Sequence, residues 1–200
     1  MKLLKSLWQF SRPHTIIGST LSILSIFAIA VGVLSEPDIA PNLLPLSLLS
    51  ALACNVYITG LNQWSDVEVD RINKPWLPIP AGLLQKKDAM RIVLFCGLLA
   101  LVSSAYLSLA FFVLIALIMA IGTAYSLPPL KFKRNHILAA GAITIVRGLL
   151  VNLGFYLHFS HEMTGEWVSA EAIWPLSVFV VAFSLGIAWF KDIPDTQGDA

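Results

Sequence analysis

Two groups of acidic residues in the sequence have the spacing needed to bind a metal ion. In the first group, Asn62, Asp66 and Asp70 follow one another at intervals of four residues. On one continuous helix they would project from the same side and place two carboxylates beside an amide. Carboxylates this close repel each other unless a cation neutralises them. The first group therefore implies a positively charged partner.

The second group follows the last apolar stretch of the chain. Asp192, Asp195 and Asp199 have the i, i+3, i+7 spacing of one helical stripe, which Pro194 is able to bend. Oxygen ligands without Cys or His favour Mg²⁺, which binds one or two carboxylates together with phosphate oxygens. Two such groups that face each other would hold a diphosphate through bridging metal ions.

The alternative is that each acidic group is only the solvated end of a helix. For a single pair of acidic residues in a membrane protein we would prefer this interpretation. Here two groups lie on the same predicted side, at the ends of apolar helices, and both are flanked by Lys or Arg. This coincidence favours metal binding.

The composition indicates that these groups are carried by membrane helices. Hydrophobic residues make up 57% of the 200 residues and charged residues only 12%, which leaves too few polar groups to cover a soluble surface. The net charge of +1 and the lack of a basic face argue against a nucleic-acid partner. Cys54 and Cys96 lie in apolar runs and support neither a disulfide framework nor a zinc site.

Six apolar runs approach or reach the roughly 20 residues that a helix needs to cross a bilayer. The sequence therefore predicts an all-α, polytopic transmembrane helix bundle that forms a single membrane domain over residues 1–200. The third and fourth runs join through Ser108, so their boundary is the least defined. The expected spans are residues 15–34, 43–61, 90–107, 109–126, 137–157 and 172–190.

The distribution of Lys and Arg predicts the orientation of the spans. The connections at residues 35–42 and 158–171 contain neither residue type, whereas the N-terminal arm and the second and fourth connections are basic. Because basic residues concentrate in cytoplasmic loops, the N-terminus and both acidic groups are expected on the cytoplasmic or stromal side. Arg147 alone lies at mid-membrane depth. It is expected to face the protein interior and to bind either an anionic substrate group or carbonyls of neighbouring helices.

Both acidic motifs resemble the two aspartate-rich motifs of the UbiA-type intramembrane prenyltransferases. The first motif runs from Asn62 to Pro75 and the second from Lys191 to Asp199. The segment from Tyr125 to Lys131 resembles the family's tyrosine-to-lysine element, with six residues of spacing in place of four. Residues 11–15, 74–78 and 191–195 are most similar to the homogentisate phytyltransferase branch, which makes tocopherol precursors.

The resemblance implies Mg²⁺-dependent transfer of a prenyl group, with phytyl as the first choice, from a prenyl diphosphate to homogentisate within the lipid bilayer. The family has nine membrane helices, so six spans imply the N-terminal two-thirds of that fold, and we expect this chain to be inactive when expressed alone. Rival hypotheses are a chlorophyll or quinone branch of the family, a transporter or channel, and an inactive remnant.

The resemblance also implies roles for individual residues. The metal ligands would be Asp66, Asp70, Asp192, Asp195 and Asp199, assisted by Asn62. The candidates for binding substrate are Arg71, Lys74, Lys131 and Lys191 as diphosphate contacts, Tyr125 as a hydrogen-bond donor, and Arg147 toward the acceptor. Basic residues at cytoplasmic helix ends can instead be ordinary membrane anchors.

Overall fold

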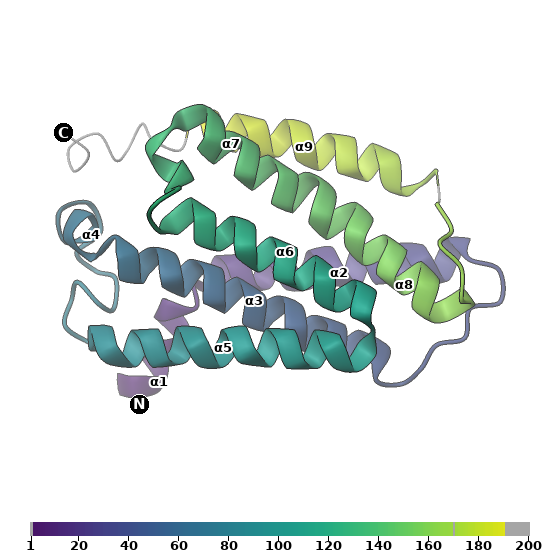
Figure 1. Cartoon of the computed structure of the whole chain (residues 1–200), viewed down its shortest axis with the longest axis horizontal. Helices are drawn as coiled ribbons and strands as arrows, with labels where there is room; N and C mark the ends of the chain where they lie inside the picture. The colour runs from purple at the N-terminus through teal and green to yellow at the C-terminus, as the bar shows by residue number, and fades with distance from the viewer. Residues whose placement is uncertain (1, 170, 191–200) are drawn as a thin grey trace.

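The computed structural model describes residues 2–169 and 171–190, and within these ranges every regular element is helical (Figure 1). Side chains are described for residues 5–169 and 171–187. The elements in chain order are α1 (Lys2–Phe10), α2 (Pro13–Val33), α3 (Leu43–Ser65), α4 (Val67–Asn73), α5 (Lys86–Leu107), α6 (Leu109–Ser126), η1 (Phe132–Arg134), α7 (His136–Thr144), η2 (Ile145–Gly154), α8 (Phe155–Thr164) and α9 (Ile173–Phe190).

Five helices are long and apolar enough to cross a membrane. They are α2, α3, α5, α6 and the continuous helix formed by α7, η2 and α8 over residues 136–164. The expected sixth span corresponds to α9, an apolar helix whose described side chains end at Ile187. The predicted all-α membrane bundle is confirmed.

Ser108 separates the third and fourth expected spans. Its backbone is extended (φ −163°, ψ 159°), and its side-chain oxygen accepts a hydrogen bond of 3.3 Å from the backbone N–H of Phe111. Ser108 thus serves as the N-cap of α6. A single long helix through both apolar runs is therefore excluded.

The fifth span is longer than expected at its C-terminal end. Residues 158–164 were expected to begin a polar connection, but they continue α8 as far as Thr164. Gly165, with φ of 76°, ends the helix in the left-handed conformation that favours glycine. The prediction failed because it counted His158 and His161 as loop residues. His158 is in fact buried, with 3% of its surface exposed.

The most extensive helix pair, α3 and α5, packs through small residues. A Cβ atom on Gly60 would lie 2.8 Å from side-chain atoms of Phe10 and Val93, and a Cβ atom on Gly97 would lie 2.8 Å from Tyr57. These glycines therefore allow close approach of the two helices and of α1. On the outer side of α5, the exposed residues Leu94, Leu98, Val102 and Tyr106 repeat every four positions and form a face suited to lipid.

Polar and charged segments gather at one end of the bundle. Figure 1 shows α1, α4 and the start of α7 at the same end, and the α2–α3, α5–α6 and α8–α9 connections at the other. Every Lys and Arg of the described residues except Arg147 belongs to the first end or to the segments leading into it. The arrangement agrees with the charge pattern of the sequence, while the side of the membrane that each end faces stays a prediction.

Candidate active site

The first acidic motif lies at a break between α3 and α4. Asp66 leaves the helical conformation (φ −106°, ψ 15°), so the expected single continuous helix is wrong at this residue. The spacing of four nevertheless survives, because the backbone N–H of Asp66 donates to the carbonyl of Asn62 at 3.1 Å and that of Asp70 donates to the carbonyl of Asp66 at 2.7 Å. The chain continues into α4 after the break, and these two backbone hydrogen bonds connect Asn62, Asp66 and Asp70.

Both oxygens of the Asp66 carboxylate have partners. The side-chain amide of Asn62 donates to Oδ2 at 3.1 Å, and the ammonium of Lys133 forms an ion pair with Oδ1. The same ammonium donates to the hydroxyl of Ser65 at 2.7 Å. Only 12% of the Lys133 side chain and 20% of the Asp66 side chain are exposed, so this is a largely buried ion pair.

The pKa of Lys133 reflects this position in the connection between α6 and α7. Burial lowers the pKa from its usual value of 10.5, while the hydrogen bond and charge of Asp66 act in the opposite direction. The charge of Lys131 lowers the pKa further and that of Asp70 raises it. Asp66, Asp70, Lys131 and Lys133 therefore form one interacting set of charges.

Sequence reasoning did not single out Lys133. It assigned the cation of this connection to Lys131, because Lys131 lies nearer to the spacing of the resembled motif. In the structure Lys131 adopts a left-handed backbone conformation with φ of 39° and precedes the short helix η1, whose turn carries Lys133 back to Asp66. The only sign of Lys133 in the sequence was that a second lysine follows Lys131 two positions later.

The other predicted diphosphate contacts lie at the same end of the bundle in different settings. Arg71 forms an exposed ion pair with Glu68 at 2.7 Å. Lys74 is half-buried at the C-terminal end of α4, and Tyr125 is half-buried in the last turn of α6. The second motif lies outside the described residues, and with it Lys191, Asp192, Asp195 and Asp199.

A cavity of about 430 Å³ lies between α2, α3, α6 and η2. Asn55 and Thr59 of α3 line it, and Asn62 and Asp66 continue their stripe at intervals of three and four residues. The cavity and Asn62, the first residue of the acidic motif, thus share one face of α3, and Asp66 follows as the C-cap of this helix. The remaining lining residues are His14, Thr15, Gly18, Ser19, Ser22, Ile23, Ala51, Cys54, Ile58, Ile115, Ile118, Val146, Arg147, Val151 and Phe155.

The polar side of the cavity is held by hydrogen bonds between α2 and α3. Thr15 donates to the Oδ1 atom of Asn55 at 2.9 Å, and the amide nitrogen of Asn55 donates to Ser19 at 2.7 Å. These bonds fix the polar side chains that face the apolar side formed by residues such as Ile115 and Phe155. The cavity therefore offers an apolar chamber with a few oriented polar groups, as small-molecule sites commonly do.

Arg147 reaches this cavity from a π-helical segment. The side-chain amide of Asn152 donates to the carbonyls of Arg147 and Gly148, both at 3.1 Å, and stabilises the wider turn of η2. The predicted inward position is only partly matched, because Arg147 lines the cavity while its side chain is also exposed. π-Helical turns occur frequently at functional sites.

The donor set at Asp66 and Asp70 fits Mg²⁺ in its chemistry. It consists of two carboxylates, one of them on Asp70 with only 5% of its surface exposed, and the amide of Asn62. Within the described residues no group of three His, Cys, Asp or Glu side chains forms a metal site. Two carboxylates are sufficient for Mg²⁺ when substrate phosphate completes the coordination, and they do not suit zinc.

Comparison with known proteins identifies the fold and the family. Residues 21–200 match the UbiA prenyltransferase family. The chain belongs to this family. As a UbiA-family chain with five helices able to cross a bilayer, it is an integral membrane protein.

Several relatives of this UbiA-family chain are homogentisate prenyltransferases. It is 41% identical over 202 residues to a homogentisate phytyltransferase of Synechocystis sp., covering 100% of this chain and 66% of the relative. It is also 41% identical to homogentisate phytyltransferase 1 of Arabidopsis thaliana, over 98% of this chain and 51% of the relative. A homogentisate geranylgeranyltransferase of Triticum aestivum is 34% identical, with 99% and 50% covered. The chain thus spans about half to two-thirds of the length of these relatives.

Solved structures show the same fold. A digeranylgeranylglyceryl phosphate synthase superposes with a TM-score of 0.74 at 21% identity, over 100% of this chain and 66% of that protein. A UbiA homolog from Archaeoglobus fulgidus bound to DMAPP and Mg²⁺ superposes with a TM-score of 0.73 at 22% identity, over 96% of this chain and 66% of the homolog.

Proposed function

We propose that this protein transfers a prenyl group, phytyl first among the candidates, from a prenyl diphosphate to homogentisate. The observation that carries the proposal is the ion pair of Asp66 with the largely buried Lys133 at the C-terminal end of α3, a helix that also lines a largely apolar cavity. The names of the relatives at 41% identity support the acceptor and the phytyl donor. Tocopherol and prenylquinone synthesis would be the corresponding biological role.

In this reaction the bond between C1 of the prenyl group and the diphosphate oxygen breaks, and its electron pair leaves with the diphosphate. An electron-rich ring carbon of the acceptor forms the new bond to C1, and the ring then loses a proton, which the released diphosphate can accept. Bound Mg²⁺ would supply Lewis-acid stabilisation of the leaving diphosphate. The chain itself must bind both substrates, orient them and keep water from the cationic prenyl group.

The acidic motif and its basic neighbours would act on the diphosphate. Asp66 and Asp70 would hold Mg²⁺ with help from Asn62, and the resemblance adds Asp192, Asp195 and Asp199. Lys131, Lys133 and Lys74 would neutralise the charge that develops on the leaving oxygens, since preorganised cations act where that charge grows. The resemblance adds Lys191, and Tyr125 would donate a hydrogen bond. Arg71 would reach the diphosphate only if its ion pair with Glu68 opens.

The cavity beside this motif would hold the organic parts of the substrates. Its apolar residues exclude water from the allylic carbon, and Arg147 would pair with the carboxylate of the aromatic acid. A volume of about 430 Å³ falls within the range of small-molecule sites. The motif and the N-terminus would face the cytoplasm or stroma, which agrees with the basic residues at that end of the bundle.

The direct test is an assay of detergent-solubilised protein with Mg²⁺, homogentisate and competing phytyl, geranylgeranyl and solanesyl diphosphates. We expect a prenylated ring product by mass spectrometry, phytyl product in excess, and loss of product with EDTA. The 200-residue chain is compared with a version extended by the C-terminal part of the Synechocystis sp. relative. If neither version forms a carbon–carbon bond while proteoliposomes move an ion or diphosphate, the prenyltransferase proposal fails and a transporter is supported.

A further inference from the structure

The ion pair between Lys133 and Asp66 joins two segments that lie 67 residues apart in the sequence. Lys133 belongs to the turn η1 between α6 and α7, and Asp66 to the break between α3 and α4. The hydroxyl of Ser65 accepts a second hydrogen bond from the ammonium, at 2.7 Å. Because most of both side chains is buried, the ammonium is held at Asp66 and is not a solvated surface charge.

The ammonium of Lys133 occupies the position at Oδ1 of Asp66 that a bound metal ion would need. Oδ2 of Asp66 accepts from the neutral amide of Asn62, whereas Oδ1 is bound by the positive ammonium. A neutral amide can turn its own oxygen toward a metal, so Asn62 is compatible with a divalent cation. An ammonium at bonding distance from the same carboxylate repels that cation strongly in a partly buried site.

We propose that Lys133 is the internal counter-cation of the unloaded site and competes with the divalent metal for Asp66. A metal ion that binds alone must displace the ammonium and leave a half-buried charge without its partner, which is costly. A metal ion that arrives with a diphosphate brings a new anion for the displaced ammonium. Lys133 thereby couples metal binding to diphosphate binding and keeps the carboxylates from binding metal without substrate.

This inference rests on the proposed function in one respect, namely that a divalent cation binds at Asp66. Mn²⁺ binding without prenyl diphosphate, measured by electron paramagnetic resonance on the purified chain, tests it directly. The variant Lys133→Met removes the ammonium and keeps much of the apolar stem. We expect it to bind Mn²⁺ about tenfold more tightly than the unmodified chain, which corresponds to about 1.4 kcal/mol.

Two control variants separate competition from general charge effects. Arg134→Met removes the same formal charge from the same turn at an exposed side chain, and its Mn²⁺ affinity should stay within about twofold of the unmodified chain. Lys133→Arg keeps the competing charge, and its Mn²⁺ affinity should also stay close to that of the unmodified chain. Equal or weaker Mn²⁺ binding by Lys133→Met would overturn the inference, as would an equal gain in Arg134→Met.

Asp66→Asn distinguishes this inference from the proposed function. If Asp66→Asn weakens Mn²⁺ binding but Lys133→Met brings no gain, only the role of Lys133 fails. If Asp66→Asn leaves Mn²⁺ binding unchanged, the metal site itself is wrong and both proposals lose their basis.

A measurement on the unmodified chain is independent of whether the variants fold. Amine-specific labelling followed by mass spectrometry reports how accessible each lysine is. Saturating Mn²⁺ should raise the labelling rate of Lys133 several-fold, because the ammonium leaves Asp66, while exposed Lys87 serves as the internal reference. An unchanged rate at Lys133 under saturating Mn²⁺ would show that metal and ammonium do not compete.

Discussion

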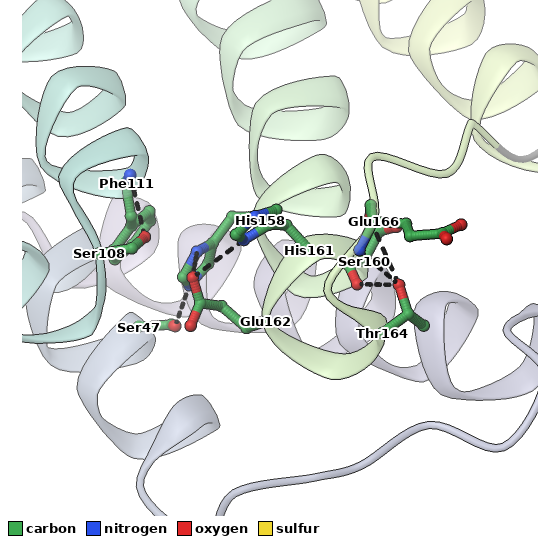
Figure 2. Close-up of polar contacts among 9 residues, drawn as sticks. All are labelled: Ser47, Ser108, Phe111, His158, Ser160, His161, Glu162, Thr164 and Glu166. Carbon is green, nitrogen blue, oxygen red and sulfur yellow. Dashed lines mark hydrogen bonds and ion pairs between the residues drawn. The ribbon is translucent and has the colours of Figure 1, made fainter.

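The two ends of the helix bundle both contain buried polar side chains, but they hold them in different ways. The acidic end, defined by Asn62, Asp66, Asp70 and Lys133, pairs full charges from separate segments at the end of α3, a helix that also lines a cavity. The histidine end, defined by His158, His161 and Glu162, takes these three side chains from a single turn of α8 (Figure 2).

At the histidine end, aromatic rings cover the polar groups. The ring of His158 stacks on Phe111 with centroids 3.8 Å apart, and its Nε2 atom lies 3.0 Å from the hydroxyl of Ser47. His161 stacks on Trp167 at 4.4 Å. The Nδ1 atoms of His158 and His161 lie 3.9 Å and 3.6 Å from the same oxygen of Glu162, as Figure 2 shows.

The difference teaches which polar clusters in this bundle are suited to chemistry. Stacking on Phe111 of α6 and a hydrogen bond with Ser47 of α3 hold His158 of α8 in one position, which is what a packing residue requires. The acidic end instead pairs a carboxylate with an ammonium from a separate segment, at the C-terminal end of a helix that also lines the cavity. On our proposal a divalent cation displaces this ammonium. Burial of polar atoms alone therefore does not distinguish the two ends, whereas a charged pair between separate segments does, and it supports placing the proposed site at the acidic end.

The largest effect should come from the acidic end. Asp66→Asn or Asp70→Asn in a form with prenyl-transfer activity should lower kcat/KM by at least about a hundredfold, or roughly 2.7 kcal/mol, because the proposed metal that binds the diphosphate loses an anionic ligand. Steady-state assays of prenyl transfer measure the change. Glu68→Gln, on the exposed side of α4, is the matched control and should stay within about threefold. Activity above about a tenth in either Asp variant would contradict the ligand role.

The histidine end should respond in stability and hardly in catalysis. His158→Ala removes a buried ring stacked on Phe111 and should lower the free energy of unfolding by about 2–4 kcal/mol. Thermal unfolding in detergent measures the loss. His161→Ala, at a more exposed ring, should cost less than half as much. If His158→Ala keeps the unfolding free energy of the unmodified chain but loses catalysis at a temperature where it is folded, the packing role assigned to this end is wrong.

Arg147 lies between the two ends and tests whether the cavity holds the acceptor. Arg147→Met should raise KM for homogentisate about tenfold, or about 1.4 kcal/mol, and leave KM for the prenyl diphosphate within twofold, because only the carboxylate pairing is removed. A hydroquinone acceptor without a carboxylate is the control and should be insensitive to the change. An unchanged KM for homogentisate would assign Arg147 to structure alone.

The sequence predicted much of the bundle because apolar length and basic connections are local properties. It predicted α6 at residues 109–126 and singled out Asn62 and Asp66, which a hydrogen bond joins in the structure, because helix formation and local side-chain contacts depend on residue type and spacing. The metal-binding role of these residues stays a prediction. It missed the long-range pairing of Lys133 with Asp66, because the turn η1 and the left-handed Lys131 determine which lysine returns to the site. It also placed His158 in a loop, because hydropathy does not detect stacking between helices.

The smallest effect should come from Arg71, which the sequence assigned to the diphosphate. Its guanidinium pairs with Glu68 at 2.7 Å, with 60% and 78% of the two side chains exposed. Exposed pairs of this kind contribute about 0.2–1 kcal/mol, and salt screens them. Arg71→Gln should therefore change the unfolding free energy by less than about 0.5 kcal/mol, and KM for prenyl diphosphate by less than about threefold.

Glu68→Gln separates the two roles of Arg71, because it breaks the same ion pair but leaves the guanidinium free to turn. If Arg71 binds diphosphate, Arg71→Gln raises KM for the diphosphate severalfold while Glu68→Gln lowers it or leaves it unchanged. Equal, small changes in both variants would place Arg71 at the solvated edge of the acidic end and leave the diphosphate to the lysines around Asp66.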